Sequence, residues 1–180
     1  MVNQRRLGSI KAARQLASTG VLDIAEAPVP LFGARDVADI LKVEFWKLQK
    51  LLESPTLNLP KPRKLGTTTR ATRVFTDIDV LRIALAVELT ADGVSAKAIG
   101  TAVLPAFEDK EEILGLTVRN GTMQAAQYGL ALMRSGDVLS AETFPWDGRE
   151  RFTTKNNPHY VRNVTELLKP YAARIQQRGK

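Results

Sequence analysis

Two short helical repeats of apolar residues, separated by only three residues, lie between Leu31 and Glu53. The first repeat consists of Val37, Ala38, Ile40 and Leu41, and the second of Phe45, Leu48, Leu51 and Leu52. A spacing of three and four residues places the members of each set on one face of a helix. The intervening Lys42-Val43-Glu44 leaves room only for a tight turn. The chain is therefore predicted to form a helix over 34–41, a turn, and a second helix over 44–53.

The outer face of the second helix is expected to meet a partner. In such a pair the small Ala38 permits a close crossing of the helices, and Val43 fills the turn. The outward positions of the second helix carry Glu44, Lys47, Gln49 and Lys50. Trp46 is expected in the core because large aromatic side chains are mostly buried, with contact to a sugar-phosphate backbone as the alternative.

A basic segment follows the two helices. Residues 61–73 contain five basic residues and no acidic residue, and Thr, Pro and Gly make up most of the rest, which disfavours a helix. The segment is predicted to be a positively charged loop or wing.

A third helix is predicted directly after this wing. Thr76 suits the N-cap, and Asp77 and Asp79 suit the positive end of the helix dipole. This helix is predicted over 76–91, and Gly93 and Ser95 then separate it from another helix over 95–104.

The order and spacing of these elements over residues 31–104 resemble the MerR-like winged helix-turn-helix family of DNA-binding domains. The segments that carry the resemblance are DVADILKV, the helix that follows it, RVFTDIDVLRI and DGVSAKAI. The resemblance implies that the second helix enters the major groove of double-stranded DNA and that the wing contacts the backbone. The residues to which DNA contacts are assigned are Arg35, Lys42, Glu44, Phe45, Lys47, Gln49, Lys50, Lys61, Arg63, Lys64, Arg70 and Arg73.

The charges are unevenly distributed along the chain, which carries a formal net charge of +7. Residues 1–19 contain four basic and no acidic residues, and residues 149–180 contain eight basic and two acidic residues. By contrast, residues 76–148 contain five basic and eleven acidic residues. A polyanion is attracted to the basic segments and repelled by the acidic one, so this distribution favours a polyanionic partner. The alternative interpretation is a solvated surface with an uneven spread of charge.

Residues 1–30 are predicted to form a basic arm or helix and a linker. An amphipathic helix ending at Gly20 either packs on the core or becomes ordered on DNA phosphates. The prolines Pro28 and Pro30 favour an extended linker into the DNA-binding part.

Residues 105–180 are predicted to form a small α+β domain for dimerisation or partner binding. Strands are predicted over 113–118, 128–133 and 138–144, with hairpin turns between them. Residues 145–158 are predicted to be a loop. The long dimerisation helix that usually follows the DNA-binding part of MerR-like proteins is not evident after residue 104.

The last predicted helix covers residues 163–177. Asn163 and Glu166 have the spacing of a capping box, and Pro170 is expected to kink the helix. Its apolar stripe is expected to cover the sheet, with a dimer interface as the alternative.

The composition excludes several kinds of chemistry. The chain has no Cys and a single His, which excludes disulfides, thiolate catalysis and cysteine-based zinc sites. It contains no glycine-rich nucleotide-binding motif and no metalloprotease motif, so neither an enzyme nor a cofactor is expected. No apolar run approaches the length of a membrane span or of a secretion signal, and a cytoplasmic location is expected.

The leading hypothesis is a sequence-specific DNA-binding protein, a bacterial or phage transcriptional regulator that acts as a homodimer on double-stranded DNA. The predicted fold is α+β, with an N-terminal winged helix-turn-helix followed by a small antiparallel β-sheet and a C-terminal helix. One alternative is a DNA-architectural or assembly factor of the excisionase, packaging or partition type. Another is a protein-interaction module that does not bind DNA.

Overall fold

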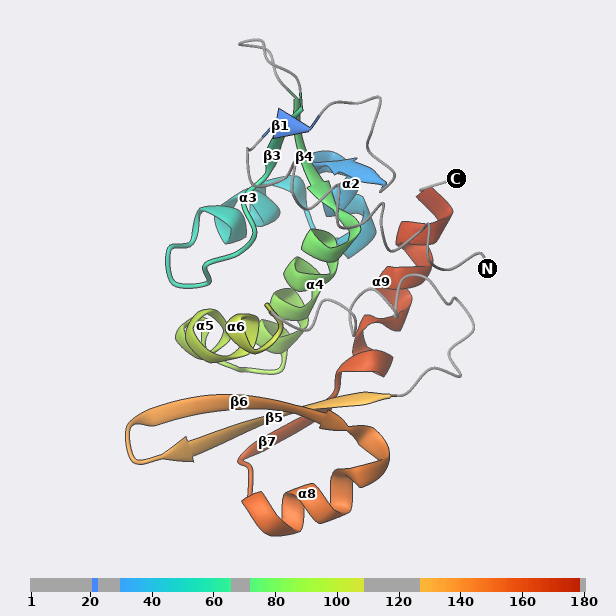
Figure 1. The fold of residues 1–180 in the computed structure, drawn as a ribbon. Coiled ribbons are helices and arrows are strands. Elements are labelled where there is room, and N and C mark those ends of the chain that lie inside the picture. Colours follow the sequence, from blue (N-terminus) through green and yellow to red (C-terminus); the bar gives the residue numbers. More distant parts are fainter. Residues whose placement is uncertain (1–20, 23–29, 66–71, 109–126, 179–180) are drawn as a thin grey trace.

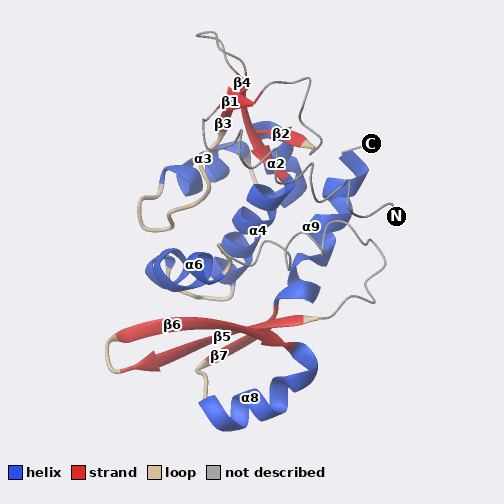
Figure 2. Ribbon diagram, viewed as in Figure 1, coloured by secondary structure: helices blue, strands red, loops and turns tan. Residues whose placement is uncertain are grey.

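The structure is a computed structural model, and it describes residues 21–22, 30–65, 72–108 and 127–178. Helices and sheets are both present, in agreement with the predicted α+β class (Figure 1, Figure 2). One sheet lies near one end of the molecule and a second sheet towards the other, with most of the helices between them (Figure 1).

The first sheet contains the predicted basic wing. Its strands are β1 (Val21–Leu22), β2 (Leu31–Gly33), β3 (Arg63–Leu65) and β4 (Thr72–Thr76), in the order β1-β3-β4-β2. β3 and β4 form an antiparallel hairpin, whose tip at residues 66–71 lies outside the described residues. β1 pairs with β3 in parallel, and the sequence does not indicate this strand. The rest of the predicted N-terminal arm or helix lies outside the described residues.

The two helices predicted around the short turn are confirmed as α2 (Ala34–Leu41) and α3 (Phe45–Glu53). Lys42 adopts a left-handed conformation with φ 55°, and the Val43 N–H donates to the Ala38 carbonyl at 3.0 Å. This bond closes the turn while Val43 packs against the core. α3 is anchored by Leu48, which is 0% exposed.

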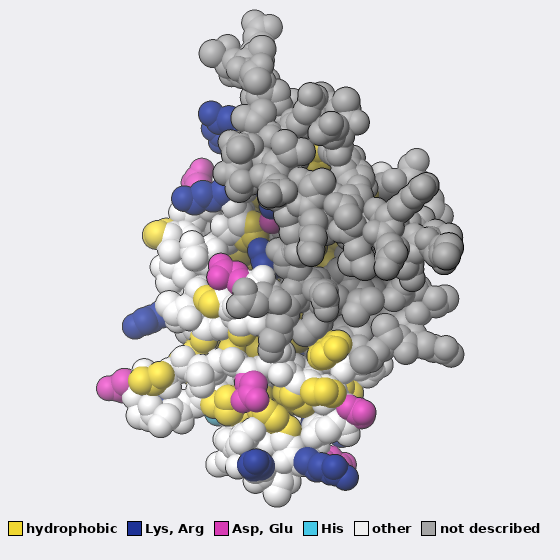
Figure 3. All heavy atoms as spheres, in the orientation of Figure 1, with side chains coloured by type: hydrophobic (Ala, Val, Ile, Leu, Met, Phe, Trp, Pro, Cys, Tyr) yellow, Lys and Arg dark blue, Asp and Glu magenta, His cyan; other side chains and the backbone are white. Residues whose placement is uncertain are grey.

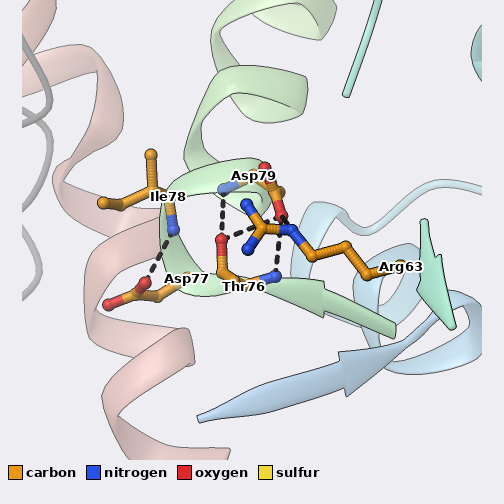
Figure 4. A network of polar contacts seen from close by, with 5 residues as sticks. All are labelled: Arg63, Thr76, Asp77, Ile78 and Asp79. Carbon is orange, nitrogen blue, oxygen red and sulfur yellow. Dashed lines mark hydrogen bonds and ion pairs between the residues drawn. The ribbon is translucent and has the colours of Figure 1, made fainter. Parts of the chain in front are cut away.

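Helix α4 (Asp77–Ala91) lies between the two sheets and is buried on most sides. Its predicted N-cap is confirmed (Figure 4). The Thr76 hydroxyl accepts from the Asp79 N–H at 3.2 Å, and the Asp79 carboxylate accepts from the Thr76 N–H at 2.9 Å. These reciprocal bonds satisfy backbone donors that a helix start otherwise leaves without partners.

The predicted fourth helix is present over residues 96–106, but its middle is π-helical. It comprises α5 (Ala96–Ala98), the π-helical turn η2 (Ile99–Val103) and α6 (Leu104–Ala106). A Cβ atom at Gly100 would lie 2.0 Å from the carbonyl oxygen of Thr56. Glycine therefore allows the loop that follows α3 to pack directly on this segment.

The second sheet contains β5 (Tyr128–Ser135), β6 (Val138–Pro145) and β7 (Tyr160–Asn163), in the antiparallel order β6-β5-β7. The predicted hairpin over 128–144 is thus confirmed, whereas the strand predicted over 113–118 lies outside the described residues. The sequence does not indicate β7, which is short and half-buried.

The prediction of a loop over 145–158 is wrong. The segment forms a 3-10 turn η3 (Trp146–Gly148) and α8 (Arg149–Asn156). α8 has no apolar stripe, because Phe152 is its only large apolar residue. Its ring stacks on Phe144 with 4.3 Å between the ring centroids, and this contact holds the helix against the sheet.

Helix α9 (Val164–Arg178) covers the second sheet as predicted and also packs on α4 and α2. The Asn163 side chain accepts from the Glu166 N–H at 3.1 Å, as predicted for an N-cap. The Glu166 carboxylate instead accepts from Gln127 at 3.1 Å. One hydrophobic core extends from Phe32 to Ile175 and crosses the predicted domain boundary at residue 105.

Replacing Gly100 by Ala is expected to destabilise the protein by about 1–3 kcal/mol or more, because the new methyl group collides with backbone rather than with a movable side chain. The free energy of unfolding in urea measures the effect. Gly148→Ala is the matched control, since no atom lies within 4 Å of an added Cβ there. Equal stability of the two variants would contradict the tight packing of the loop on Gly100.

Alkaline pH is expected to destabilise the fold through two phenols. Partial burial, and then a hydrogen bond to Asp92, raise the pKa of Tyr160 above its ordinary value. Partial burial, and then a hydrogen bond to Glu88, raise the pKa of Tyr171 in the same way. A raised folded pKa stabilises the protein fully below the unfolded pKa of about 10, and this stabilisation is lost as the pH rises beyond it. The double variant Tyr160→Phe/Tyr171→Phe should show a shallower loss of unfolding free energy above pH 10. The same loss in both proteins would refute this account.

Candidate nucleic-acid interface

The exposed face of α3 and the β3–β4 hairpin lie at the same end of the molecule (Figure 1). Basic side chains, with an acidic side chain among them, lie at the upper left edge in Figure 3, where α3 and β3 lie in Figure 1. The exposed residues of α3 and its N-cap are Glu44, Phe45, Trp46, Lys47, Gln49, Lys50 and Glu53. The predicted contact residues of this helix therefore all face solvent.

Trp46 is 52% exposed, and its predicted burial in the core is wrong. Trp46 precedes the buried Leu48 by two residues, which places the two side chains about 200° apart around the helix. The ammonium groups of Lys47 and Lys50 lie 5.4 and 5.2 Å from the centroid of the indole ring. The position of Trp46 out of phase with Leu48 is the sequence signal that indicates an outward side chain.

An ion pair at the start of α3 partly balances the charge of this face. The Lys47 ammonium lies 3.1 Å from the Glu44 carboxylate, and both side chains are exposed. An acid at the N-terminus of a helix suits the helix dipole. Gln49, Lys50 and the acidic Glu53 are the other exposed polar residues of α3.

The hairpin carries two like charges directly opposite each other. Lys64 is the cross-strand neighbour of Arg73, and both side chains are exposed. Like charges in this position destabilise an isolated hairpin. An anionic partner relieves the repulsion, so this pair favours a polyanion on the hairpin.

Arg63 points the other way, towards the start of α4 (Figure 4). Successive residues of a strand face opposite sides of the sheet, so Arg63 and Lys64 diverge. The Arg63 Nε atom lies 3.9 Å from the Asp79 carboxylate. The structure therefore separates Arg63 from the exposed Lys64–Arg73 pair, although the sequence places them in one basic segment.

The remaining predicted contact residues lie around this end of the molecule. Arg35 is exposed on α2, Lys42 is exposed in the turn between α2 and α3, and Lys61 is exposed just before β3. Arg70 lies outside the described residues.

Other kinds of site find little support in the described parts of the chain. No group of three or more His, Asp and Glu side chains there is arranged to hold a metal ion. Every helix among the described residues is too short or too polar to cross a membrane. Comparison with known proteins gives no matching family model and no significant match to a curated protein.

Truncating Trp46 to Ala is expected to change the unfolding free energy by less than about 0.5 kcal/mol, because the side chain is exposed. Leu48→Ala is the matched variant on the buried face and should cost about 2–5 kcal/mol. Urea denaturation of both variants checks the orientation of α3. A similar loss in the two variants would place Trp46 in the core.

Proposed function

We propose that this protein is a sequence-specific DNA-binding protein of the transcriptional regulator type, in which α3 enters the major groove and the β3–β4 hairpin contacts the phosphate backbone. The observation that carries the proposal is the exposed Lys64–Arg73 pair next to an α3 whose outer face serves no packing role. In this proposal, DNA phosphates neutralise the charges of Lys64 and Arg73, and the outer face of α3 contacts the bases in the major groove.

The dimensions of α3 suit this role. The helix has nine residues, which corresponds to a length of about 14 Å. The major groove of B-DNA is about 12 Å wide and accepts a helix together with its side chains. Gln49 pairs favourably with adenine edges, and Lys47 and Lys50 with guanine edges.

The helix and the hairpin have a common rigid base. Leu48 of α3 and Phe75 of β4 are both fully buried in the hydrophobic core. Rigid placement of both elements allows one duplex to be contacted in its groove and on its backbone at the same time. The homodimer stays a prediction, motivated by the paired half-sites of many helix-turn-helix proteins.

Exposed aromatic residues favour a second candidate function. Phe45 is 39% and Trp46 is 52% exposed, on adjacent positions of α3. Aromatic side chains are enriched in protein interfaces, so α3 is also suited to binding another protein. The two functions differ in their dependence on salt, because only DNA binding releases many condensed counterions.

Site selection from a random DNA library, followed by affinity measurements, tests the proposal. Gln49→Ala and Lys50→Ala should each weaken binding to the selected site by about 1–3 kcal/mol and change binding to unrelated DNA little. Lys64→Ala and Arg73→Ala should weaken binding to both kinds of DNA. Each should also lower the slope of log affinity against log salt by about 0.9 per lost phosphate contact.

Lys155→Ala on α8 is the control, since this exposed Lys lies at the opposite end of the molecule. The proposal fails if the selection enriches no sequence, or if the α3 and hairpin variants bind like the control. Retained binding to a protein partner in that case supports the second candidate function.

A further inference from the structure

A small polar pocket lies on the Arg63 side of the hairpin. The segments around it are the loop before β3, β3 itself, the first half of α4 and the end of the 96–106 segment. Its lining residues are Asn58, Pro60, Lys61, Arg63, Asp79, Arg82, Leu104 and Glu108. The volume of about 230 Å³ lies below the range of about 300–1,000 Å³ typical of pockets for drug-sized ligands. The pocket therefore suits a small group rather than an extended molecule.

The guanidinium group of Arg63 has donor capacity that the described protein groups do not use. Its contact with Asp79, at 3.9 Å, is an ion pair but is too long for a hydrogen bond. The same Asp79 oxygen already accepts from the N–H and the hydroxyl of Thr76, at 2.9 and 2.8 Å. Among the described residues, no hydrogen bond from the Arg63 side chain is present, although this side chain is only 34% exposed. A half-buried guanidinium with unused N–H donors is suited to binding an anionic acceptor.

Two further cations line the pocket. Arg82 donates to the carbonyl groups of Phe107 and Glu108 at 3.3 and 3.4 Å, which holds its guanidinium at the edge of the pocket. Lys61 is exposed and makes no ion pair with any described residue. Two carboxylates also line the pocket. The Asp79 carboxylate caps α4, and Glu108 is an exposed residue.

We infer that this pocket binds an oxyanion such as a phosphate group, with Arg63 as a bidentate donor and Lys61 as the second cation. The planar fork of a guanidinium matches two oxygens of a phosphate, and an ammonium adds charge without a fixed geometry. The phosphate is either a free ion or a backbone phosphate of DNA, and the second source rests on the proposed function. In either case the bound group connects the base of the hairpin to the loop that follows α3.

Titration with inorganic phosphate, with chloride replaced so that the ionic strength stays constant, tests the pocket without DNA. Phosphate should broaden its own ³¹P NMR line and raise the melting temperature of the wild-type protein. Arg63→Gln should abolish both effects, and Arg63→Lys should weaken them because the fork is lost. Lys155→Gln on α8, at the opposite end of the molecule from the hairpin, is the control and should behave like the wild type.

Lys61→Gln is a second variant that leaves the cap of α4 intact. It should weaken phosphate binding several-fold even if Arg63→Gln destabilises the fold. A phosphate effect that is unchanged in both Lys61→Gln and Arg63→Gln overturns the proposal.

Duplexes of the selected sequence with single neutral methylphosphonates identify the source of the group. If the pocket takes a DNA phosphate, one substitution weakens wild-type binding about tenfold or more and leaves Arg63→Gln binding unchanged. If inorganic phosphate binds but no position is coupled to Arg63, the ligand is a free anion. If neither inorganic phosphate binding nor a methylphosphonate position coupled to Arg63 is found, the proposal is overturned. Absence of DNA binding alone refutes only the proposed function.

Discussion

Burial of α4 on most of its sides holds the two sheets of this protein together. Leu81, Ile83, Leu85 and Leu89 are fully buried, and each contributes about 1.5–3 kcal/mol relative to an exposed side chain. The ion pairs of Arg178 with Asp36 and Asp39 are half-exposed, and pairs of this kind contribute about 0–1 kcal/mol. The apolar contacts of α4 therefore contribute far more to stability than these ion pairs between α9 and α2.

Apolar periodicity and capping chemistry predict much of this fold. α2, α3, α4, the β5–β6 hairpin and α9 each bury a regular stripe or begin at a recognisable cap, and both signals are local in the sequence. α8 lacks such a signal, because a single stacking contact between Phe152 and Phe144 holds it in place. β7 is defined by pairing with β5, and the strand partner is not encoded in the local pattern of its four residues.

The candidate interface was predictable where helix phase decides the direction of a side chain, as for Gln49 and Lys50. The general tendency of aromatic side chains to be buried predicts a core position for Trp46, whereas its helical phase, opposite to that of Leu48, indicates an exposed one. Arg63 and Lys64 are neighbours in one basic segment, and only the strand register places one towards α4 and the other towards solvent. A count of charges along the sequence cannot distinguish these two roles.

The contacts between α9 and α2 also bear on the order in which the protein folds. Arg178 and Asp36, which form one of these contacts, are 142 positions apart in the chain. The entropy lost on closing a loop grows with its length, and distant contacts form slowly. The α2–α3 pair and the β5–β6 hairpin are local and are expected to form early. Docking of α9 is then a late step, and until it occurs the apolar side of α4 that α9 covers is exposed to association with other chains.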